Sequence, residues 1–391
     1  MKEKFLRELA DIQTGPFGSQ LHKEDYVADG TPIVTVEHLG NKMFSEQNLP
    51  RVSNTDKNRL KKYVLKQGDI VFSRVGSVDR CSYVDQKHDG WMFSGRCLRV
   101  RPTSEIDSEY LYYYFCLEET KQFVRNIAVG ATMPSINTKL LGEVVVTFPE
   151  LEQQKRISGI LSAIDSKIEV NQKINDNLLE QMQALYKSWF VDYRPFGGVM
   201  PTSWTQTGIY SLANIIYGAP FASKQFNTEG NGRPIIRIRD LKDQQFATYT
   251  TEVHPKGYLL HPGDIVVGMD GEFRPYIWGN DEAWLNQRVC VFENKRPNGK
   301  AFLYFTIKPL LFAIEQTQVA TTVIHIGKKD FDAFEIMLPD TELLDAFDVI
   351  TTPMVEQIVS NSIENKRLAI MRDALLPKLM SGEINVSNIQ L

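Results

Sequence analysis

Apolar residues recur at alternating intervals of three and four along one segment of the chain. They are Ile157, Leu161, Ile164, Ile168, Leu178, Met182, Leu185 and Trp189, and Asn171 and Asn175 occupy the two positions in the middle. This spacing predicts a long helix with a coiled-coil seam. The same register returns 190 residues later, where Asn361 and Asn365 again interrupt it. The chain is therefore expected to contain two related long helices.

The segments that precede the two helices also match each other. The sequence LKQGDIV at residues 65–71 returns as LHPGDIV at 260–266, and GTPIV at 30–34 returns as GRPII at 232–236. A repeat of about 190 residues is much longer than the 20–50 residues of a solenoid unit. We therefore expect two homologous domains, each followed by its own long helix.

Within each domain, short β-rich runs alternate with glycine, proline and aspartate, which indicates strands separated by turns. The runs are residues 33–36, 70–72 and 144–148 in the first domain, and 235–238, 265–267 and 289–292 in the second. An aromatic run at 110–115 predicts a helix packed on the sheet. The expected fold class is α+β, with two homologous mixed α/β domains separated by two antiparallel helices in a pseudo-two-fold internal repeat.

These patterns divide the chain into five parts. They are a first domain at 1–149, a central helical region at 150–192, a linker rich in proline and glycine at 193–204, a second domain at 205–339 and a C-terminal helical region at 340–391. Because Pro353 falls inside the last region, we expect it to kink the second helix or to delay its start.

The four asparagines give the helix pair a testable register. If the helices pack antiparallel about a pseudo-two-fold axis, Asn171 faces Asn365 and Asn175 faces Asn361. Polar residues at seam positions lower stability but specify register, and the register would set the distance between the domains. The alternative interpretation is that these asparagines are solvent-exposed helix residues.

Composition and charge bound the function. The 391 residues suffice for two domains with separate cores. No apolar run approaches the roughly 20 residues of a membrane span and the N-terminus leads into no signal-peptide core, so we expect a cytoplasmic protein. The net charge of −4 argues against nucleic-acid binding, unless arginines converge on one surface or partner subunits supply positive charge.

Motifs for catalysis are missing from the sequence. It contains no GxxxxGK[ST] phosphate loop, no GxGxxG and no [ND]PP[FY] tetrapeptide of the kind that aminomethyltransferases use. The six histidines lack metal-ligand spacing, and the four cysteines form no CxxC pair. We expect no catalytic residue, no cofactor and no metal in this chain.

Three loops rich in glycine, hydroxyl residues and arginine recur in both domains. Residues 15–19 match 218–223, 73–77 match 268–271, and 130–136 match 319–325. Glycine permits close backbone approach, hydroxyls bind phosphate oxygens, and arginine can make bidentate contacts with guanine. Since matching loops differ in their side chains, they suit two readers of different DNA sequences.

The candidate DNA contacts come from these loops and from nearby arginines. In the first domain they are Gly15, Phe17, Gly18, Ser19, Arg74, Gly76, Ser77, Arg96, Thr132, Ser135 and Asn137. In the second they are Phe221, Ser223, Arg237, Arg239, Asp270, Arg274, Gln287, Arg288, Thr321, Thr322 and His325. The alternative is that the loop residues only form turns and that the arginines only form surface ion pairs.

The helical regions resemble the conserved regions of type I restriction-modification specificity subunits. The resemblance rests on QQKRI at 153–157, ILSAIDSKI at 160–168, LYKSWFVDY at 185–193 and MRDALLPKLMSGEI at 371–384, and it extends over the whole chain. It implies two target recognition domains, each reading one half of a bipartite asymmetric DNA site. The helices would separate these domains and hold two methylation subunits.

The resemblance also implies what the partners contribute. Two modification subunits would supply the methyl donor and adenine chemistry, and restriction subunits would supply translocation and cleavage. The chain itself would be a non-catalytic DNA-recognition subunit. The second repeat lacks an arginine where Arg74 stands, which leaves open whether Asp270 or Arg274 does an equivalent job. The rival hypotheses are a protein-binding scaffold without DNA recognition and a single-chain nuclease.

Overall fold

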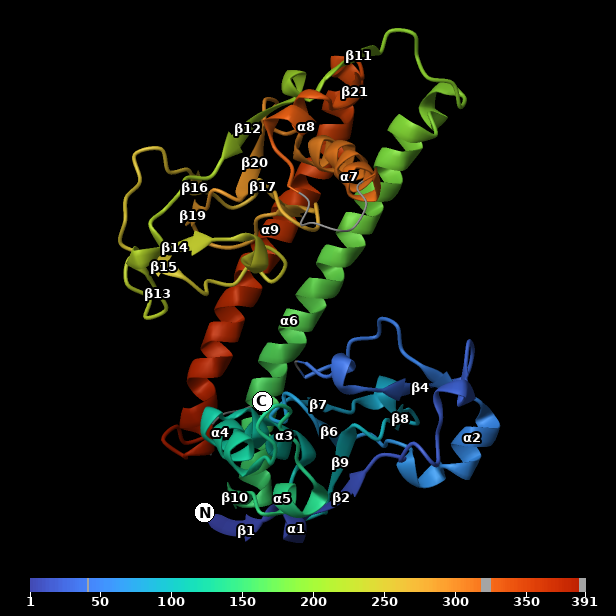
Figure 1. The fold of residues 1–391 in the computed structure, drawn as a ribbon, viewed down its shortest axis with the longest axis vertical. Coiled ribbons are helices and arrows are strands. Elements are labelled where there is room, and N and C mark those ends of the chain that lie inside the picture. The colour runs from blue at the N-terminus through green and yellow to red at the C-terminus, as the bar shows by residue number, and fades with distance from the viewer. Residues whose placement is uncertain (41, 318–324, 387–391) are drawn as a thin grey trace. The chain divides into compact units, whose positions relative to one another are not determined.

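The computed structural model describes residues 1–40, 42–317 and 325–386 (Figure 1). The chain divides into two compact units. Unit 1 comprises Met1–Ser166 and Leu368–Leu391, and unit 2 comprises Lys167–Arg367. We call the globular part of unit 1 that precedes the first long helix domain 1, and the globular part of unit 2 domain 2. None of the described helices is both long and apolar enough to cross a membrane.

Domain 1 contains two four-stranded sheets and a separate strand pair. The first sheet is antiparallel, in the order β2 (Ala10–Thr14), β9 (Cys97–Pro102), β6 (Ile70–Ser73) and β7 (Cys81–Tyr83). The second has the order β3 (Tyr26–Val27), β5 (Arg51–Val52), β4 (Thr31–Val34) and β8 (Met92–Phe93), with β4 and β8 parallel. The separate pair is β1 (Lys2–Phe5) with β10 (Val145–Phe148). The strands expected at 70–72 and 144–148 are therefore present, whereas the strand expected at 33–36 ends at Val34 and Val36 begins the 3-10 helix η2 (Val36–His38).

The helices of domain 1 are α1 (Leu6–Leu9), α2 (Asn54–Arg59), α3 (Ser108–Cys116), α4 (Glu118–Ile127) and α5 (Thr138–Gly142). The carboxylate of Asp107 begins α3 by accepting a hydrogen bond from Tyr110 N at 2.9 Å, a common way to satisfy free amides at a helix start. The aromatic run lies in α3 and is buried, and the ring of Phe115 packs edge-on against that of Phe72 in β6. The predicted aromatic helix on the sheet is thus confirmed.

Domain 2 repeats this topology. Its antiparallel sheet has the order β12 (Ala213–Tyr217), β20 (Val289–Asn294), β17 (Ile265–Gly268) and β18 (Pro275–Ile277). Its second sheet has the order β13 (Phe226–Asn227), β15 (Tyr249–Thr250), β14 (Arg233–Ile236), β19 (Ala283–Leu285) and β16 (Leu259–Leu260), with β14 and β19 parallel. The pair β11 (Thr205–Gly208) with β21 (Glu335–Leu338) and the helices α7 (Lys300–Thr317) and α8 (Lys328–Asp332) complete the domain. The internal repeat expected from sequence is therefore a repeat of strand order and direction.

The repeated Gly-Asp sequence forms the same turn in both domains. Gly68 has φ +89° and Gly263 has φ +87°, a backbone conformation that favours glycine. The carboxylate of Asp69 accepts hydrogen bonds from Lys66 N at 2.8 Å and Arg101 Nε at 2.7 Å. The corresponding Asp264 accepts from His261 N at 2.8 Å. This motif recurs because it closes a structural turn.

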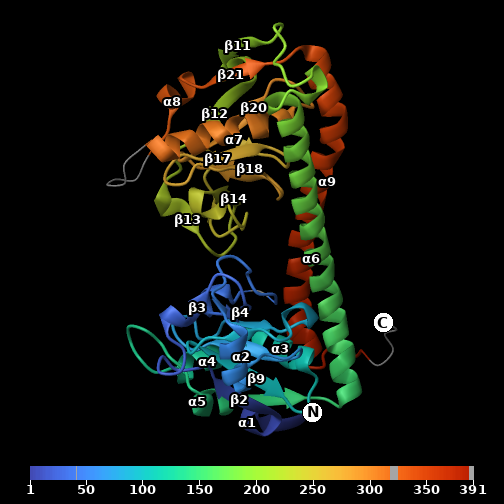
Figure 2. The same cartoon turned by 90° about the vertical axis from the view of Figure 1, so that its right-hand side faces the viewer.

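Two long helices, α6 (Leu151–Tyr186) and α9 (Thr341–Met380), contribute to both units and lie side by side within each (Figures 1 and 2). A π-helical turn, η5 (Lys187–Val191), follows α6. The expectation that Pro353 delays the second helix is wrong, since α9 begins at Thr341. Proline leaves the carbonyl of residue 349 without its helical partner. Val349 is 76% exposed, so water can satisfy that carbonyl.

The asparagines meet across the two helices within unit 2. Asn171 Nδ2 donates to Asn365 Oδ1 at 2.9 Å, and Asn361 Nδ2 donates to Asn175 Oδ1 at 2.8 Å. The helices are therefore antiparallel in the register that the pseudo-two-fold relation predicts. Asn171 is 1% exposed and Asn361 is 5% exposed. The alternative of solvent-exposed asparagines does not hold for these two.

Each domain packs its core against the long helices of its own unit. In unit 1 the core includes Ile157 and Leu161 from α6 and Leu376 and Leu379 from α9. In unit 2, Met182, Phe347 and Val355 belong to the core. Of these residues, Ile157, Leu161, Met182, Phe347 and Leu379 stand at seam positions, so seam residues of the long helices also belong to the domain cores.

Candidate nucleic-acid interface

The loops singled out in domain 1 are joined to one another through the backbone. Four hydrogen bonds connect them, namely Gly15 N to Cys97 O at 3.2 Å, Arg74 N to Arg96 O at 2.8 Å, Ile136 N to Arg74 O at 2.9 Å and Gly76 N to Pro134 O at 2.8 Å. Residues 15–19, 73–77, 94–96 and 130–137 therefore form one continuous surface, which we call loop face 1. This surface lies at one end of the antiparallel sheet, where β2 and β6 end and β9 begins.

Domain 2 has an equivalent surface, formed by residues 218–223, 268–271, 286–288 and 325–326, which we call loop face 2, and three of the four backbone contacts have counterparts there. The hydrogen bonds are Gly218 N to Val289 O at 3.0 Å, Met269 N to Arg288 O at 2.9 Å and Ile326 N to Met269 O at 2.9 Å. An isolated β-bridge joins Val75 to Ser135 in domain 1, and another joins Asp270 to His325 in domain 2. The structure therefore equates four positions, Arg74 with Met269, Val75 with Asp270, Arg96 with Arg288, and Ser135 with His325.

Glycine at the start of each face has a structural explanation. A Cβ on Gly15 would lie 2.1 Å from Ser94 O, and one on Gly218 would lie 2.1 Å from Asn286 O. Any side chain there would collide with the neighbouring backbone. Gly15 therefore supports the loop face from beneath, whereas Gly18 has open space around its Cβ position.

On loop face 1, an aromatic ring and an arginine lie together. Phe17 is 56% exposed, and the Arg74 guanidinium carbon lies 6.0 Å from its ring centroid. Arg74 Nη1 donates to Gly95 O at 2.9 Å, which fixes the side chain against the β8–β9 loop. Arg96 is exposed nearby. An exposed ring beside two arginines can contact bases or sugars and phosphates together.

Most of the remaining candidates of loop face 1 are exposed, and the side chains of two candidates, Ser135 and Asn137, bond to the loop's own backbone. Those that are exposed are Gly18, Ser19, Gly76, Ser77, Thr132 and Asn137. The Ser135 hydroxyl donates to Val129 O at 3.1 Å, and Asn137 Oδ1 accepts from Leu140 N at 2.8 Å at the start of α5. Both side chains thus stabilise the loop itself.

Phe221 is a correction to the predicted DNA contacts. It is 5% exposed and packs with its ring centroid 5.6 Å from that of Trp284, in a small core with Ala219 and Ile235. A buried ring cannot reach a ligand, so Phe221 supports the second sheet. Its neighbour Ser223 is exposed.

Two of the arginines in domain 2 already have protein partners. Arg237 donates to the Thr248 hydroxyl and lies 5.8 Å from the Phe226 ring centroid. Arg274 forms a bidentate ion pair with Glu315 on α7. Arg237 Nε also lies 3.7 Å from Asp240 Oδ2. The ion-pair interpretation therefore describes both side chains, and Arg274 does not take the place of Arg74. Arg239 is exposed and lies 3.7 Å from a carboxylate oxygen of Asp240.

Loop face 2 instead gathers a carboxylate, an imidazole and a guanidinium. His325 Nδ1 lies 2.7 Å from Asp270 Oδ1, and Arg288 Nε lies 3.7 Å from Asp270 Oδ2. Arg288 Nη1 is 3.2 Å from His325 Nδ1. Sequence reasoning named these residues separately, and only the fold shows that they form one cluster. Gln287 is exposed next to it, whereas Thr321 and Thr322 lie outside the described residues.

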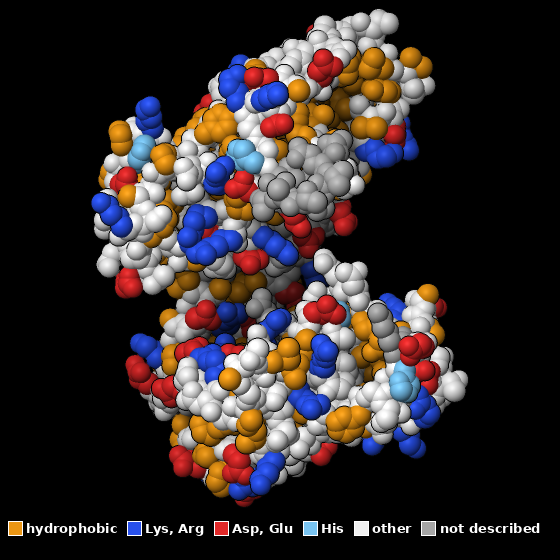
Figure 3. Space-filling view, viewed as in Figure 1, with side chains coloured by type: hydrophobic (Ala, Val, Ile, Leu, Met, Phe, Trp, Pro, Cys, Tyr) orange, Lys and Arg blue, Asp and Glu red, His pale blue; other side chains and the backbone are white. Residues whose placement is uncertain are grey.

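The charge of the chain is mixed at the surface. On the face shown in Figure 3, lysine and arginine side chains are interspersed with acidic ones in both units. Within the part of the chain that the structure describes, no group of three or more His, Cys, Asp or Glu side chains is placed to hold a metal ion. The arginines of the loop faces are thus local features on a surface of mixed charge.

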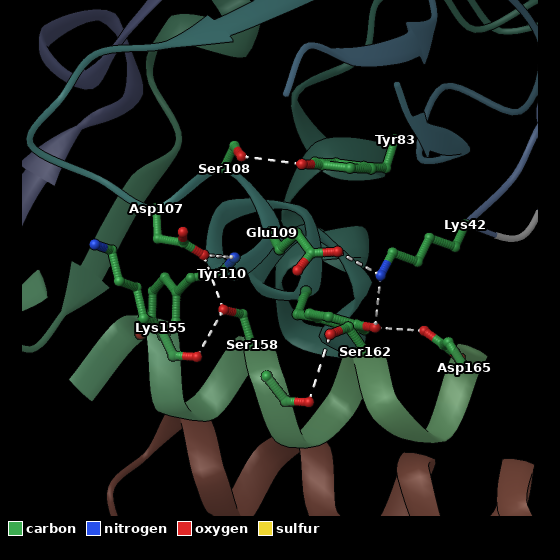
Figure 4. A network of polar contacts seen from close by, with 12 residues as sticks. Lys42, Tyr83, Asp107, Ser108, Glu109, Tyr110, Lys155, Ser158, Ser162 and Asp165 are labelled. Carbon is green, nitrogen blue, oxygen red and sulfur yellow. Dashed lines mark hydrogen bonds and ion pairs between the residues drawn. The ribbon is translucent and has the colours of Figure 1, made fainter. Parts of the chain in front are cut away.

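A polar network that sequence reasoning missed attaches domain 1 to α6 (Figure 4). The Tyr113 hydroxyl on α3 donates to Asp165 on α6, and Arg372 Nη1 on α9 donates to the same carboxylate at 2.7 Å. Burial, and then the neighbouring Asp165 carboxylate, raises the pKa of Tyr113. One sequence signal pointed to this contact, because Arg372 stands at a seam position where an apolar residue is expected.

Further contacts extend this network, one at α3 and one between the start of α3 and α6. Lys42 Nζ donates to Glu109 Oε1 at 2.7 Å, and the Ser158 hydroxyl donates to Asp107 Oδ1 at 2.9 Å (Figure 4). Asp107 also begins α3, so one carboxylate joins the helix start to α6. Domain 1 therefore meets its long helix in an orientation that directional hydrogen bonds specify.

Comparison with known proteins identifies related chains. A family model described as "Type I restriction modification DNA specificity domain" matches residues 1–180 and 201–360. The MjaIX specificity subunit of Methanocaldococcus jannaschii is 26% identical over 317 residues, which cover 74% of this chain and 72% of that protein. The HindI specificity subunit of Haemophilus influenzae is 24% identical over 413 residues, covering 83% of this chain and 88% of that protein.

A solved structure supports the fold. The S subunit of a type I restriction-modification system from M. genitalium matches with a TM-score of 0.59 over 97% of this chain and 95% of that chain, at 16% identity. That likeness concerns the architecture, and the family model covers most of both repeats. The chain therefore belongs to the family of type I restriction-modification DNA specificity proteins.

Proposed function

We propose that this chain is the non-catalytic DNA-recognition subunit of a type I restriction-modification enzyme. Domain 1, at residues 1–149, and domain 2, at residues 205–339, each read one half of a bipartite asymmetric DNA site. Both relatives described above are named as specificity subunits of type I restriction enzymes. Two DNA-recognition domains in one chain would allow it to recognise both halves of such a site.

The observation that carries the proposal is the pairing of a shared backbone with different side chains. Both loop faces use equivalent backbone hydrogen bonds and equivalent β-bridges. At the matched positions, however, Arg74, Val75 and Ser135 are replaced by Met269, Asp270 and His325. DNA sequence is read mainly by side chains at base edges, so this difference suits recognition of two different half-sites.

The helical regions at 150–192 and 340–391 hold the two readers, with 193–204 as a linker. We propose that the asparagine pairs set the helix register and hence the spacing between half-sites. A helix of the length of α6, 36 residues, spans roughly 54 Å, more than one DNA turn of about 34 Å. Lengthening the spacer of the DNA site by one base pair should therefore abolish recognition.

The proposed partners are double-stranded DNA, two modification subunits and the restriction subunits, in the cytoplasm. Modification subunits would supply methyl transfer, and restriction subunits would supply ATP-driven translocation and cleavage. They would also supply positive charge that a chain with net charge −4 lacks, because phosphate binding requires neutralisation of the DNA backbone.

The test is methylation sequencing of the source genome with the gene intact, deleted and restored. Loss of a single two-part adenine-methylated motif on deletion, and its return on restoration, is expected. The purified chain should leave plasmid DNA intact in Mg²⁺, since cleavage would favour the nuclease alternative. A complex with the modification subunits that shows no salt-dependent DNA affinity would favour the scaffold alternative.

A further inference from the structure

We propose that Arg288 on loop face 2 reads a guanine in the half-site of domain 2, oriented for that task by Asp270, whose carboxylate is in turn held by His325. This inference rests on the proposed function and adds a specific base contact to it. The geometry of the side-chain cluster around Arg288 supports it.

The cluster lies beside two nitrogens of the guanidinium and leaves the side chain half exposed. Asp270 uses Oδ1 for the His325 ring at 2.7 Å and presents Oδ2 toward Arg288 Nε at 3.7 Å. The same His325 Nδ1 lies 3.2 Å from Arg288 Nη1. A ring nitrogen that donates to Asp270 cannot also accept from Arg288, so His325 holds the carboxylate, and the carboxylate faces the guanidinium. The Arg288 side chain nevertheless remains 52% exposed. Since arginine carries five N–H donors in a planar fork, donors remain for a ligand.

The backbone beneath the cluster is itself tied together. Arg288 O accepts a hydrogen bond from Met269 N at 2.9 Å, and Ile326 N donates to Met269 O at 2.9 Å. Asp270 and His325 form an isolated β-bridge directly beside these contacts. Three side chains from different loops are thus anchored at adjacent points, which lowers the entropic cost of orienting the arginine on binding.

Charge distinguishes a base contact from a phosphate contact. A carboxylate beside Arg288 offsets its positive charge and repels a phosphate, whereas the O6 and N7 atoms of guanine are neutral acceptors. A planar guanidinium matches those two acceptors bidentately, and this is the commonest specific protein–DNA contact. Asp270 therefore favours base reading over backbone binding at this position.

Domain 1 provides a natural contrast. Arg96 occupies the position of Arg288, but Val75 and Ser135 stand where domain 2 has Asp270 and His325. The exposed Arg96 thus lacks the matching carboxylate and imidazole. Removal of Arg96 is expected to affect only the other half-site, which makes it an internal reference for any change at Arg288.

The experiment uses the chain in complex with its modification subunits and duplexes that carry each of the four base pairs at every position of both half-sites. Arg288→Ala and Arg288→Lys should both lose discrimination at one G·C position in a single half-site, by about tenfold to a hundredfold. Lysine keeps the charge but cannot form the planar bidentate contact. Asp270→Asn should weaken discrimination at the same position. Arg194→Ala, an exposed arginine in the linker, serves as the matched control.

Different results would overturn the idea. One such result is that Arg288→Lys keeps full base discrimination, whereas Arg288→Ala weakens binding to every duplex equally. If Arg288→Ala also lowers the slope of log affinity against log salt concentration by about one, Arg288 contacts a phosphate. A half-site without a G·C pair sensitive to Arg288 also contradicts the proposal. If the wild-type complex shows no sequence preference at all, the proposed function itself fails, and that outcome is visible before any variant is measured.

Discussion

In each unit a domain packs against the two long helices, but at one set of matched positions the contacts are polar in unit 1 and apolar in unit 2. In unit 1, Tyr113 from α3, Asp165 from α6 and Arg372 from α9 form a hydrogen-bonded trio. At the equivalent repeat positions of unit 2 stand Phe305 from α7, Val355 from α9 and Met182 from α6, all buried in one apolar core. Every polar member of the first trio thus has an apolar counterpart in the second.

This contrast shows that the repeated backbone does not dictate the character of its core. A fully polar trio is stable when buried because each donor and acceptor forms a hydrogen bond within it. A fully apolar trio is stable because it contains no polar atom that requires a hydrogen-bond partner. A mixed trio leaves a buried charge or hydroxyl without a partner and is costly. The chemistry of one position therefore constrains the other two.

Aromatic rings surround the apolar trio of unit 2 and add to its apolar packing. Tyr186 packs with ring centroids 5.7 Å from Phe302 and 5.6 Å from Phe305, and Phe190 lies 5.0 Å from Phe347. These contacts bury much area but define direction less sharply than hydrogen bonds do. Unit 1 relies on directional contacts where unit 2 relies on ring packing.

The largest expected effect comes from moving one polar residue into the apolar trio. Val355→Asp should destabilise unit 2 by at least about 3 kcal/mol, because the new carboxylate is buried without a partner. Hydrogen exchange of domain 2 amides measures the loss separately from unit 1. Val355→Leu is the control of similar polarity, and an equal loss there would show that size rather than charge matters.

A second comparison concerns the matched aromatic residues of the loops. Phe221→Ala should cost domain 2 about 3 kcal/mol, since it empties a buried site. Phe17→Ala should change the stability of domain 1 by less than about 0.5 kcal/mol, because the ring is exposed. Thermal unfolding checks both, and DNA binding of the Phe17 variant should fall despite its intact fold. Equal stability losses would contradict the different roles assigned to the two rings.

The polar trio of unit 1 can be broken and then replaced. Asp165→Val should cost about 2 kcal/mol, because Arg372 and the Tyr113 hydroxyl lose their shared acceptor. The exposed neighbour Asp373 still pairs with Arg372, which limits the loss. Hydrogen exchange of α3 amides reports the effect.

The control for that prediction converts the whole trio to its counterpart from unit 2. A triple variant with Tyr113→Phe, Asp165→Val and Arg372→Met should lie within about 1 kcal/mol of the natural chain. A triple variant as unstable as Asp165→Val alone would show that the surroundings of unit 1, and not only the trio, require polar groups.

Replacing the asparagine pairs should change the stability of the helix pair and the specificity of its register in opposite directions. Changing Asn171 and Asn361 to leucine should raise the stability of the helix pair by about 1 kcal/mol, because buried apolar side chains replace polar ones. Specification of the register should weaken at the same time. Calorimetry tests the first effect, and an unchanged or lowered melting temperature would count against the assigned role.

The smallest expected effect is a pH dependence at the contact between domain 2 and α9. Burial, only partly offset by Arg296, raises the pKa of Asp348 above its usual value of 3.8. Between the pKa of Asp348 in the unfolded chain and its raised pKa in the folded protein, the folded state binds more protons than the unfolded state. The contribution of Asp348 to the free energy of unfolding therefore falls as the pH rises through this range and is constant above it. Asp348→Asn should remove that fall, as followed by melting temperature between pH 4 and 7.

Long-period patterns in the sequence were sufficient to predict the architecture. The seam spacing, the recurring Gly-Asp turn and the 190-residue offset are local consequences of helix and turn geometry, so they predicted α6, α9 and the duplicated domains. The prediction for Pro353 was wrong because a helix can contain proline where the carbonyl that loses its hydrogen bond is exposed to solvent. Solvent exposure of a helix position depends on tertiary packing, so the local sequence does not reveal it.

The roles of single side chains were less predictable. Phe17 and Phe221 occupy matching loops, yet one is exposed and the other buried. Similarly, Arg274 was a candidate for the role of Arg74, but its side chain pairs with Glu315 on α7. Such facts depend on which distant segment lies opposite, and no local pattern encodes that.

By itself, the sequence determined that this protein has two homologous domains, two long helices and the conserved regions of a DNA specificity subunit. Periodicity and repetition survive in one dimension because helices and turns are built from neighbouring residues. Only the tertiary structure decided that Asp270, His325 and Arg288 meet on one face and that Tyr113, Asp165 and Arg372 meet on another. Those contacts join residues tens to hundreds of positions apart, so they exist only once the chain has packed.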